Sequence, residues 1–202
     1  MEKNIAESHN GHEFVDLGLP SGLLWATCNV GATSPEQTGL YFAWGETTGY
    51  TAEDFKTGKA LFDDTTYKAK NISSDLALEQ DAAHVCMGGK WRMPTKIECK
   101  ELIMCCSLTL TKNYNGSGIA GCIFKSKKNG KSIFIPASGY IGRYTLGNEG
   151  LCGYIRTSSL FHLNKSAHLY FDVDWFTIKY NNAGVSYGLR CYGLPVRGVC
   201  KK

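Results

Sequence analysis

Short apolar segments separated by turn-forming residues dominate the first part of the chain. Segments 12–18 ("HEFVDLG") and 23–32 ("LLWATCNVGA") are rich in aromatic and β-branched residues, and the turn sequence "LPSG" separates them. Segment 40–46 ("LYFAWGE") is a third extended apolar piece, whereas residues 47–74 are polar and irregular. The pattern predicts a strand in each apolar segment and a long loop after them.

Helical periodicity is confined to the middle of the chain, where two helices are predicted. The first, "DLALEQDAAHVCMGG", has Asp75 as its N-cap and ends at Gly88 and Gly89. The second begins at Thr95, and Glu98 follows three residues later, the spacing at which the two side chains satisfy each other's backbone donors. The apolar face of this second helix comprises Leu102, Ile103, Cys105 and Cys106.

Strand patterns return after the helices. Segment "GCIFKSKKNGKSIFIPASG" alternates on both sides of Asn129 and Gly130, which predicts a hairpin closed by a two-residue turn. Residues 153–166 show no clean period and are predicted to be irregular surface. The remainder reads as an antiparallel meander, with predicted strands at 167–173, 175–180, 186–191 and 194–200.

The order of strands, two helices and further strands predicts the fold class. It is typical of a single α+β domain, here 12–200, preceded by a mobile tail over 1–11. A length of 202 residues and a hydrophobic content of 43% are enough for a substantial core.

Charge and cysteine content exclude several classes of protein. The net charge of +4 is too small to indicate nucleic-acid binding, although residues 151–202 hold seven Lys or Arg and only two Asp or Glu. The nine cysteines include no C-x-x-C pair, which argues against metal fingers and thioredoxin-like chemistry and favours reduced thiols. The N-terminus lacks the apolar segment of a secretory signal, and no apolar run is long enough for membrane insertion.

Motifs for catalysis or metal binding are weak. "GSGIAG" (116–121) matches a dinucleotide fingerprint, but a hairpin follows it where that fingerprint needs a helix. His9 and His12 lie in the predicted tail, and His84 is expected to be a packed or surface histidine on the first helix. Asp172 and Asp174 alone are too few for calcium. The chain is therefore predicted to be non-catalytic, with no cofactor and no metal.

Aromatic residues are concentrated near the C-terminus. Residues 151–202 contain nine of the 24 aromatics, and Tyr, Ser, Gly and Asn supply 17 of these 52 residues. Rigid rings among small polar residues are typical of antibody-like contact surfaces. Phe171, which alternates with Leu169, is assigned to the core instead. The predicted ligand-binding residues are Tyr154, Arg156, Phe161, His162, Asn164, Trp175, Phe176, Tyr187 and Tyr192.

Five segments carry a resemblance to a known family. They are "EFVDLGLPSGLLWATCNVGA" (13–32), "YFAWGE" (41–46), "GGKWRMPT" (88–95), "IFIPASGY" (133–140) and "YGLPVRGV" (192–199). Together they resemble the Fibrobacter succinogenes major paralogous domain, which is abundant in gut Bacteroidales and their phages. The resemblance implies a C-type-lectin-like fold with two helices packed on short antiparallel strands and a loop-rich C-terminal β-region. It also implies that Arg190 and Arg197 belong to the scaffold and hold loop carbonyls.

Some members of this fold are variable proteins of diversity-generating retroelements, in which template adenines are randomised. The resemblance therefore implies a ligand-binding module whose C-terminal surface, about 151–195, is diversified for receptor binding. Cys152, Ile155 and Arg156 are not the residues expected in a segment that otherwise matches the family. Lys165 and Trp175 do not fit the simplest scheme, in which the adenines of asparagine codons are randomised. The expected partner is a protein or glycan on a cell surface, and the expected location is a phage particle or bacterial surface, otherwise the cytoplasm.

Two alternatives remain open. The chain could be a structural adhesin or phage tail subunit, with its aromatics buried against other copies in an oligomer. The related formylglycine-generating oxidase fold binds copper through a close cysteine pair, for which Cys152 and Cys191 are the candidates, although their surroundings do not match. The Glu-Pro-Asn and Trp-Asn-Asp motifs of calcium-dependent lectins are absent from the sequence, so calcium-mediated sugar binding is not implied.

Overall fold

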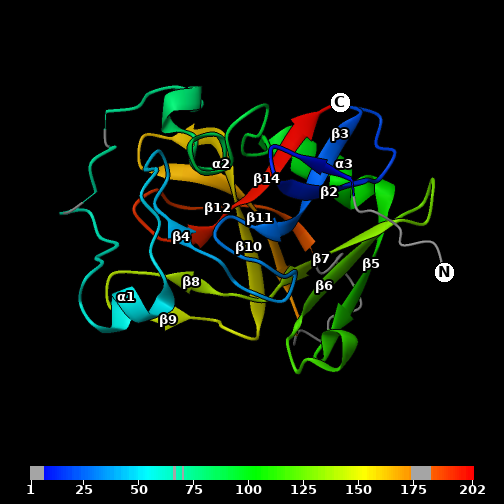
Figure 1. The fold of residues 1–202 in the computed structure, drawn as a ribbon. Helices are drawn as coiled ribbons and strands as arrows, with labels where there is room; N and C mark the ends of the chain where they lie inside the picture. Colours follow the sequence, from blue (N-terminus) through cyan, green and yellow to red (C-terminus); the bar gives the residue numbers. More distant parts are fainter. Residues whose placement is uncertain (1–6, 66, 70, 174–182) are drawn as a thin grey trace.

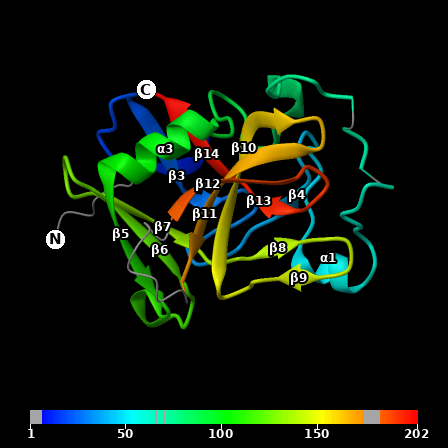
Figure 2. The same ribbon diagram turned by 180° about the vertical axis from the view of Figure 1, so that it is seen from behind.

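A computed structural model describes residues 7–65, 67–69, 71–173 and 183–202 of the chain. Antiparallel strands in several small sheets make up most of its regular structure, with three α-helices in the described part (Figure 1). The β5–β6–β7 sheet lies at one end of the molecule, and the β8–β9 hairpin lies with α1 at the other (Figure 2). The predicted α+β class is confirmed.

One sheet joins the two ends of the described chain. Its order is β1-β2-β3-β14, and the bounds are Ser8–His9, His12–Asp16, Leu23–Asn29 and Arg197–Lys201. Asn10 and Gly11 both have positive φ and form a two-residue turn between β1 and β2. The Trp91 indole donates to the His9 carbonyl at 2.9 Å. Residues 8–11 of the expected tail are therefore part of the sheet.

The predicted hairpin is present, but its turn differs from the prediction. The sheet β5-β6-β7 has the bounds Cys106–Thr111, Gly121–Ser126 and Ser132–Pro136. The amide of Ser126 donates to the Lys131 carbonyl, so residues 127–130 form a four-residue loop. Only Gly130 has a positive φ there, since Asn129 is not in the left-handed region. The two-residue Asn-Gly turn of this chain is at residues 10–11 instead.

A third sheet occupies the C-terminal part of the chain, in the order β10-β11-β12. Its bounds are Cys152–His162, Lys165–Asp172 and Ala183–Leu189. The prediction that 153–166 is irregular is wrong, because most of it forms β10. Residues 156–159 of β10 are all buried, so burial on both faces removes the polar alternation that marks a half-exposed strand. The predicted strand at 175–180 lies outside the described residues.

Two short ladders complete the strands. β4 (Tyr41–Phe42) pairs with β13 (Leu194–Pro195), and β8 (Tyr140–Ile141) pairs with β9 (Leu146–Gly147). β13 and β14 together cover the predicted strand 194–200, whereas the expected strand 40–46 is reduced to two residues.

The helices confirm part of the prediction. α3 (Lys96–Cys105) begins with the predicted capping box between Thr95 and Glu98, and α2 (Ala82–Met87) ends at Gly88 as expected. The N-cap of α2 is Asp81 rather than Asp75, because a short 3-10 helix, Leu78–Gln80, precedes it. α1 (Ala52–Lys56) lies in the expected loop, and a second 3-10 turn spans Tyr114–Gly116. Among the described residues no helix is long and apolar enough to cross a membrane.

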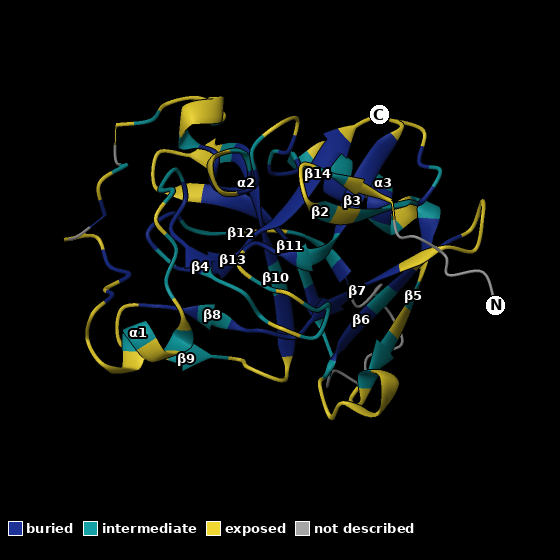
Figure 3. Cartoon of the chain, in the orientation of Figure 1, coloured by how far each residue is buried: buried dark blue, intermediate teal, exposed yellow. Residues whose placement is uncertain are grey.

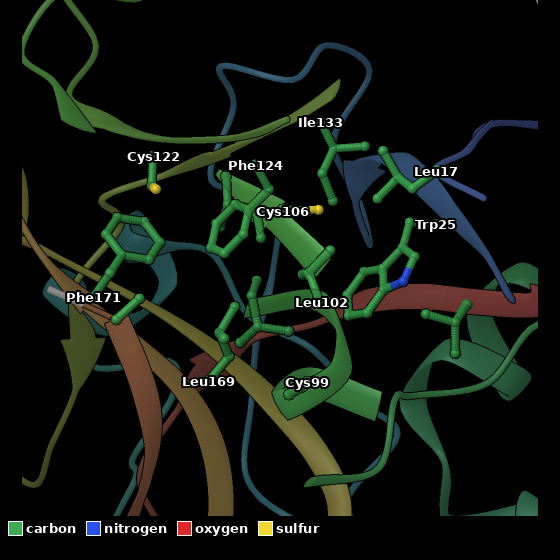
Figure 4. Close-up of a cluster of buried hydrophobic side chains, with 14 of the residues drawn as sticks. Leu17, Trp25, Cys99, Leu102, Cys106, Cys122, Phe124, Ile133, Leu169 and Phe171 are labelled. Atoms are coloured by element: carbon green, nitrogen blue, oxygen red, sulfur yellow. The ribbon is translucent and has the colours of Figure 1, made fainter. Parts of the chain in front are cut away.

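The largest core cluster joins three of the sheets. Phe171 and Leu169 of β11 meet Phe124 of β6, Leu102 of α3 and Trp25 of β3 (Figure 4). Exposed residues lie mainly in loops, while the strands are largely buried (Figure 3). The inward-facing residues of β10–β12 are thus fixed by the core, and only the opposite face of this sheet is free to carry a site.

Two buried arginines behave as the resemblance implies. Arg190 donates to the carbonyls of Leu163, Ala69 and Ile72, and its guanidinium lies 4.3 Å from the centroid of the Trp44 ring. Arg197 donates to Asn29 Oδ1 at 2.8 Å and to three backbone carbonyls. Both side chains hold backbone in place, as expected of scaffold residues.

Candidate functional site

The β10–β11–β12 sheet has two chemically different faces. Because neighbouring side chains alternate, Ile155, Leu169 and Phe171 point into the core while Tyr154 and Tyr170 point to the other side. Tyr154 pairs with Tyr170 across the two strands, and their ring centroids are 5.3 Å apart. The outer face therefore presents phenol rings on a rigid base.

A pocket of about 340 Å³ lies on this outer face, which we call the tyrosine pocket. It is lined by Tyr140, Tyr154, His168, Tyr170, Ser186, Tyr187, Gly188, Leu189, Tyr192 and Leu194. Its volume falls at the lower end of the range typical of small-molecule sites. Five tyrosines from β8, β10, β11, β12 and the segment before β13 thus meet in one place.

The tyrosine rings support one another. Tyr140 stacks on Tyr192 with centroids 5.5 Å apart and planes at 16°, and the Tyr154 ring meets Tyr140 edge-on at 5.7 Å. Asn148 Nδ2 donates to Tyr154 Oη at 3.0 Å, and Tyr170 Oη donates to an oxygen of Asp172 at 3.2 Å. These contacts orient the phenols before any ligand arrives, which lowers the entropic cost of binding.

Burial keeps the ionisable groups of the pocket neutral. Desolvation raises the pKa of Tyr154 to about 12 and also raises the pKa values of Tyr192 and Cys152. Burial, reinforced by the nearby Arg156 cation, lowers the pKa of His168 to about 3. At neutral pH the pocket therefore presents neutral phenols and a neutral imidazole, each able to donate or accept a hydrogen bond.

His168 makes the stability of the fold sensitive to acid. Its pKa is lower in the folded chain than the ordinary histidine value near 6.5, so the unfolded chain takes up a proton first as the pH falls. The contribution of His168 to the free energy of unfolding is fully present above about pH 6.5. It is lost progressively as the pH falls towards 3. Urea unfolding of the wild type should show about 2 kcal/mol lost through this group between pH 7 and pH 5. His168→Gln should remove that part of the pH dependence, and equal pH slopes for the two proteins would contradict it.

Three of the nine predicted binding residues line the pocket. Tyr154 and Tyr192 are half-buried in it, and Tyr187 lies at its edge, where its ring stacks on Phe161 with centroids 3.7 Å apart. Phe161 is 51% exposed, and His162 and Asn164 are exposed beside it at the β10–β11 connection. These three residues form a rim outside the pocket. Trp175 and Phe176 lie outside the described residues.

Arg156 is not a surface residue, so its prediction as a contact residue is wrong. Its side chain is fully buried within β10, where its guanidinium donates to Ser166 Oγ at 2.8 Å and to the Tyr192 carbonyl. Burial lowers its pKa to about 9, and the charge has no carboxylate among its hydrogen-bond partners in the described chain. Arg156 supports the pocket from the sheet face that it shares with Tyr154 and His168, because its guanidinium holds the backbone carbonyl of Tyr192.

Seven pocket residues were not predicted from the sequence: Tyr140, His168, Tyr170, Ser186, Gly188, Leu189 and Leu194. Two of them had a usable signal, since the alternation in "AHLYFD" places His168 and Tyr170 on the face opposite Leu169 and Phe171. No sequence signal placed Tyr140 in the pocket, because it lies in a distant segment. Only the packing of the folded chain brings its ring there.

The remaining motifs have structural explanations. The glycine-rich segment 116–121 leads into β6, as the hairpin prediction required. His84 Nδ1 lies 3.1 Å from the Trp91 carbonyl, which fits the packed histidine that was expected. Among the described residues no three His, Cys, Asp or Glu side chains gather at one point. A larger hollow of about 610 Å³ beside β3 is lined by residues 11–13 and 26–33 together with Leu40, Cys86 and Met87. None of these lining residues is a Phe, Tyr or Trp.

Comparisons with known protein families, with curated proteins and with solved structures find no match to this chain. The function is therefore inferred from the geometry of the tyrosine pocket and its rim.

Proposed function

We propose that the chain is a non-catalytic ligand-binding module that uses the tyrosine pocket and its exposed rim to recognise a partner on a cell surface. The observation that carries this proposal is the convergence of five tyrosines on one pocket, two of which, Tyr154 and Tyr170, stand on the outer face of the β10–β11–β12 sheet. Tyrosine offers a large ring and a hydroxyl at a small entropic cost, which is why contact surfaces use it. The α+β architecture is compatible with the C-type-lectin-like fold that the family resemblance implies.

Diversification by a retroelement is the second part of the proposal. Substituting the adenines of an asparagine codon can produce tyrosine, histidine and serine codons. Tyr154, His168, Tyr170, Ser186 and Tyr192 belong to these residue types and share the outer face or its edge. A near-identical, adenine-rich copy of the coding region for 151–200 beside a reverse-transcriptase gene would support this part. Neighbouring DNA without either feature would remove it and leave the binding role standing.

The oxidase alternative is less well supported by the chemistry of the thiols. Copper binding by a cysteine pair needs thiolates, which form most readily where the pKa is low. Burial raises the pKa of Cys152 and raises that of Cys191 to about 12. Both thiols are therefore held in the protonated form at neutral pH.

Removing a pocket ring should weaken binding strongly. We expect Tyr154→Ala and Tyr192→Ala each to reduce the affinity for Bacteroidales cells about 30-fold, which corresponds to about 2 kcal/mol for a central aromatic anchor. Flow cytometry with the fluorescently labelled chain over a concentration series measures this affinity. Tyr144→Ala is the matched control, because that tyrosine is 81% exposed and lies outside the pocket lining. Saturable binding that all three variants retain unchanged would refute a binding role for the pocket.

A further inference from the structure

We propose that the tyrosine pocket binds a sugar ring directly, without calcium, and that His168 Nδ1 exchanges a hydrogen bond with a sugar hydroxyl. This inference rests on the proposed function, because it names the ligand class of the same pocket. Three features of the described residues point to it: an unpaired buried imidazole nitrogen, phenol walls of mixed chemistry and a buried cation beside His168.

The imidazole of His168 is prepared for a partner that the folded chain does not supply. Its side chain lines the pocket and is only 5% exposed, yet Nδ1 has no hydrogen-bond partner among the described residues. A buried polar atom left unpaired costs about 1–3 kcal/mol, so such atoms normally find partners. A hydroxyl group on a ligand would recover this energy.

Gly188 lies beside the edge of the imidazole that carries Nδ1. A β-carbon at Gly188 would lie 3.2 Å from Cε1 and 3.6 Å from Nδ1 of His168. Since Gly188 also lines the pocket, a side chain at this position would stand between the pocket and that buried nitrogen. The glycine has no positive φ, so backbone conformation does not explain its presence there.

The walls match a molecule that has both an apolar face and hydroxyl groups. The rings of Tyr140, Tyr154 and Tyr192 offer aromatic surface, while their phenol groups and Ser186 can donate or accept hydrogen bonds. A pyranose ring has C–H groups on its faces and hydroxyls around its edge, so it can use both kinds of surface together. A purely apolar ligand would leave the imidazole and the hydroxyl groups without partners.

The buried charge of Arg156 beside His168 opposes a cationic ligand. Arg156 is the cross-strand partner of His168, and its guanidinium is buried without a carboxylate among its hydrogen-bond partners in the described chain. A positive ligand would therefore meet uncompensated positive charge in a poorly screened environment. This repulsion opposes the capture of a quaternary ammonium group, to which an aromatic pocket would otherwise be suited. A neutral or acidic sugar avoids it.

Saturation-transfer NMR on the full chain tests the proposal. The probes are the methyl glycosides of glucose, galactose, mannose and N-acetylglucosamine, together with methyl glucosamine and methyl N-acetylneuraminate. We expect transfer to ring C–H protons of at least one neutral or acidic glycoside, unchanged by EDTA, and none to the cationic glucosamine. Transfer to no glycoside, loss of transfer with EDTA, or preference for glucosamine would each overturn the proposal.

Two matched variants locate the binding. Gly188→Ala should reduce the affinity for the best glycoside at least 10-fold, because its methyl group covers the imidazole edge. Gly184→Ala, on the same strand, should leave affinity unchanged, since its β-carbon would meet no atom within 4 Å. Equal affinity in Gly188→Ala, with unchanged circular dichroism, would place the sugar elsewhere and overturn the proposal. Cell binding that depends on Tyr154 and Tyr192 without any glycoside binding would overturn only the sugar and leave the proposed function intact.

Discussion

Arg197→Met should destabilise the fold by about 4 kcal/mol. The fully buried guanidinium of Arg197 donates to Asn29 Oδ1 and to the carbonyls of Ala26, Thr27 and Phe134. These bonds connect β14 to β3 and to β7, and those to the Ala26 and Phe134 carbonyls are buried. Methionine has a similar length but no donor, so several buried acceptors lose their partners at about 1–3 kcal/mol each, partly offset because a buried charge is also removed.

Urea and thermal unfolding under reducing conditions measure this loss. For a chain of this length, about 4 kcal/mol corresponds to a fall in Tm of about 10 °C. Arg143→Met is the matched control, because that arginine is half exposed and its nearest carboxylate oxygen, on Asp63, is 3.6 Å away. The free energy of unfolding of Arg143→Met should stay within about 0.5 kcal/mol of the wild type. Equal effects of the two substitutions would show that Arg197 does not hold the sheets together.

Gly153→Ala should cost about 3 kcal/mol, although it adds a single methyl group. Gly153 in β10 is the cross-strand partner of Phe171, and a β-carbon there would lie 2.0 Å from Cζ and 2.3 Å from Cε1 of the Phe171 ring. Phe171 is fully buried against Phe124, with ring centroids 6.2 Å apart, so the ring cannot move without disturbing the core. The clash must be relieved by displacing packed atoms.

A double-mutant cycle separates this clash from other effects of removing a glycine. Phe171→Leu creates space, so Gly153→Ala should cost about 1–2 kcal/mol less in the Phe171→Leu background than in the wild type. Gly184→Ala, on strand β12 of the same sheet, should stay within about 0.5 kcal/mol of the wild type because no atom lies within 4 Å of its β-carbon. Strictly additive costs in the cycle would contradict the steric explanation.

Local signals in the sequence were reliable where the cause is local. The Thr95–Glu98 capping box and the helix end at Gly88 depend on a few neighbouring residues, and both are present. The rule that Asn-Gly favours a two-residue turn holds in this chain, but at a different Asn-Gly pair from the one predicted. Residues 10–11 form the tight turn, and residues 129–130 do not. Which turn forms depends on how the flanking strands are paired, and that is decided elsewhere in the chain.

The candidate site was only partly predictable because its parts come from distant elements. Composition directed attention to Tyr154, Tyr187 and Tyr192. It misjudged Arg156, because a cationic residue in an unpatterned segment is usually exposed, whereas here backbone carbonyl and hydroxyl acceptors allow its burial. Tyr140 could not be assigned, since only the packing of the β8–β9 hairpin brings its ring onto Tyr192.

The alternation of side chains along β11 has a consequence for how this chain can evolve. Ala167, Leu169 and Phe171 belong to the interior, while His168 and Tyr170 line the tyrosine pocket. An inserted or deleted residue in this strand would exchange the two sets, placing phenol and imidazole in the core and leucine and phenylalanine in the pocket. Pocket residues of this strand can therefore be replaced one for one, while a change of length within the strand would disrupt the core.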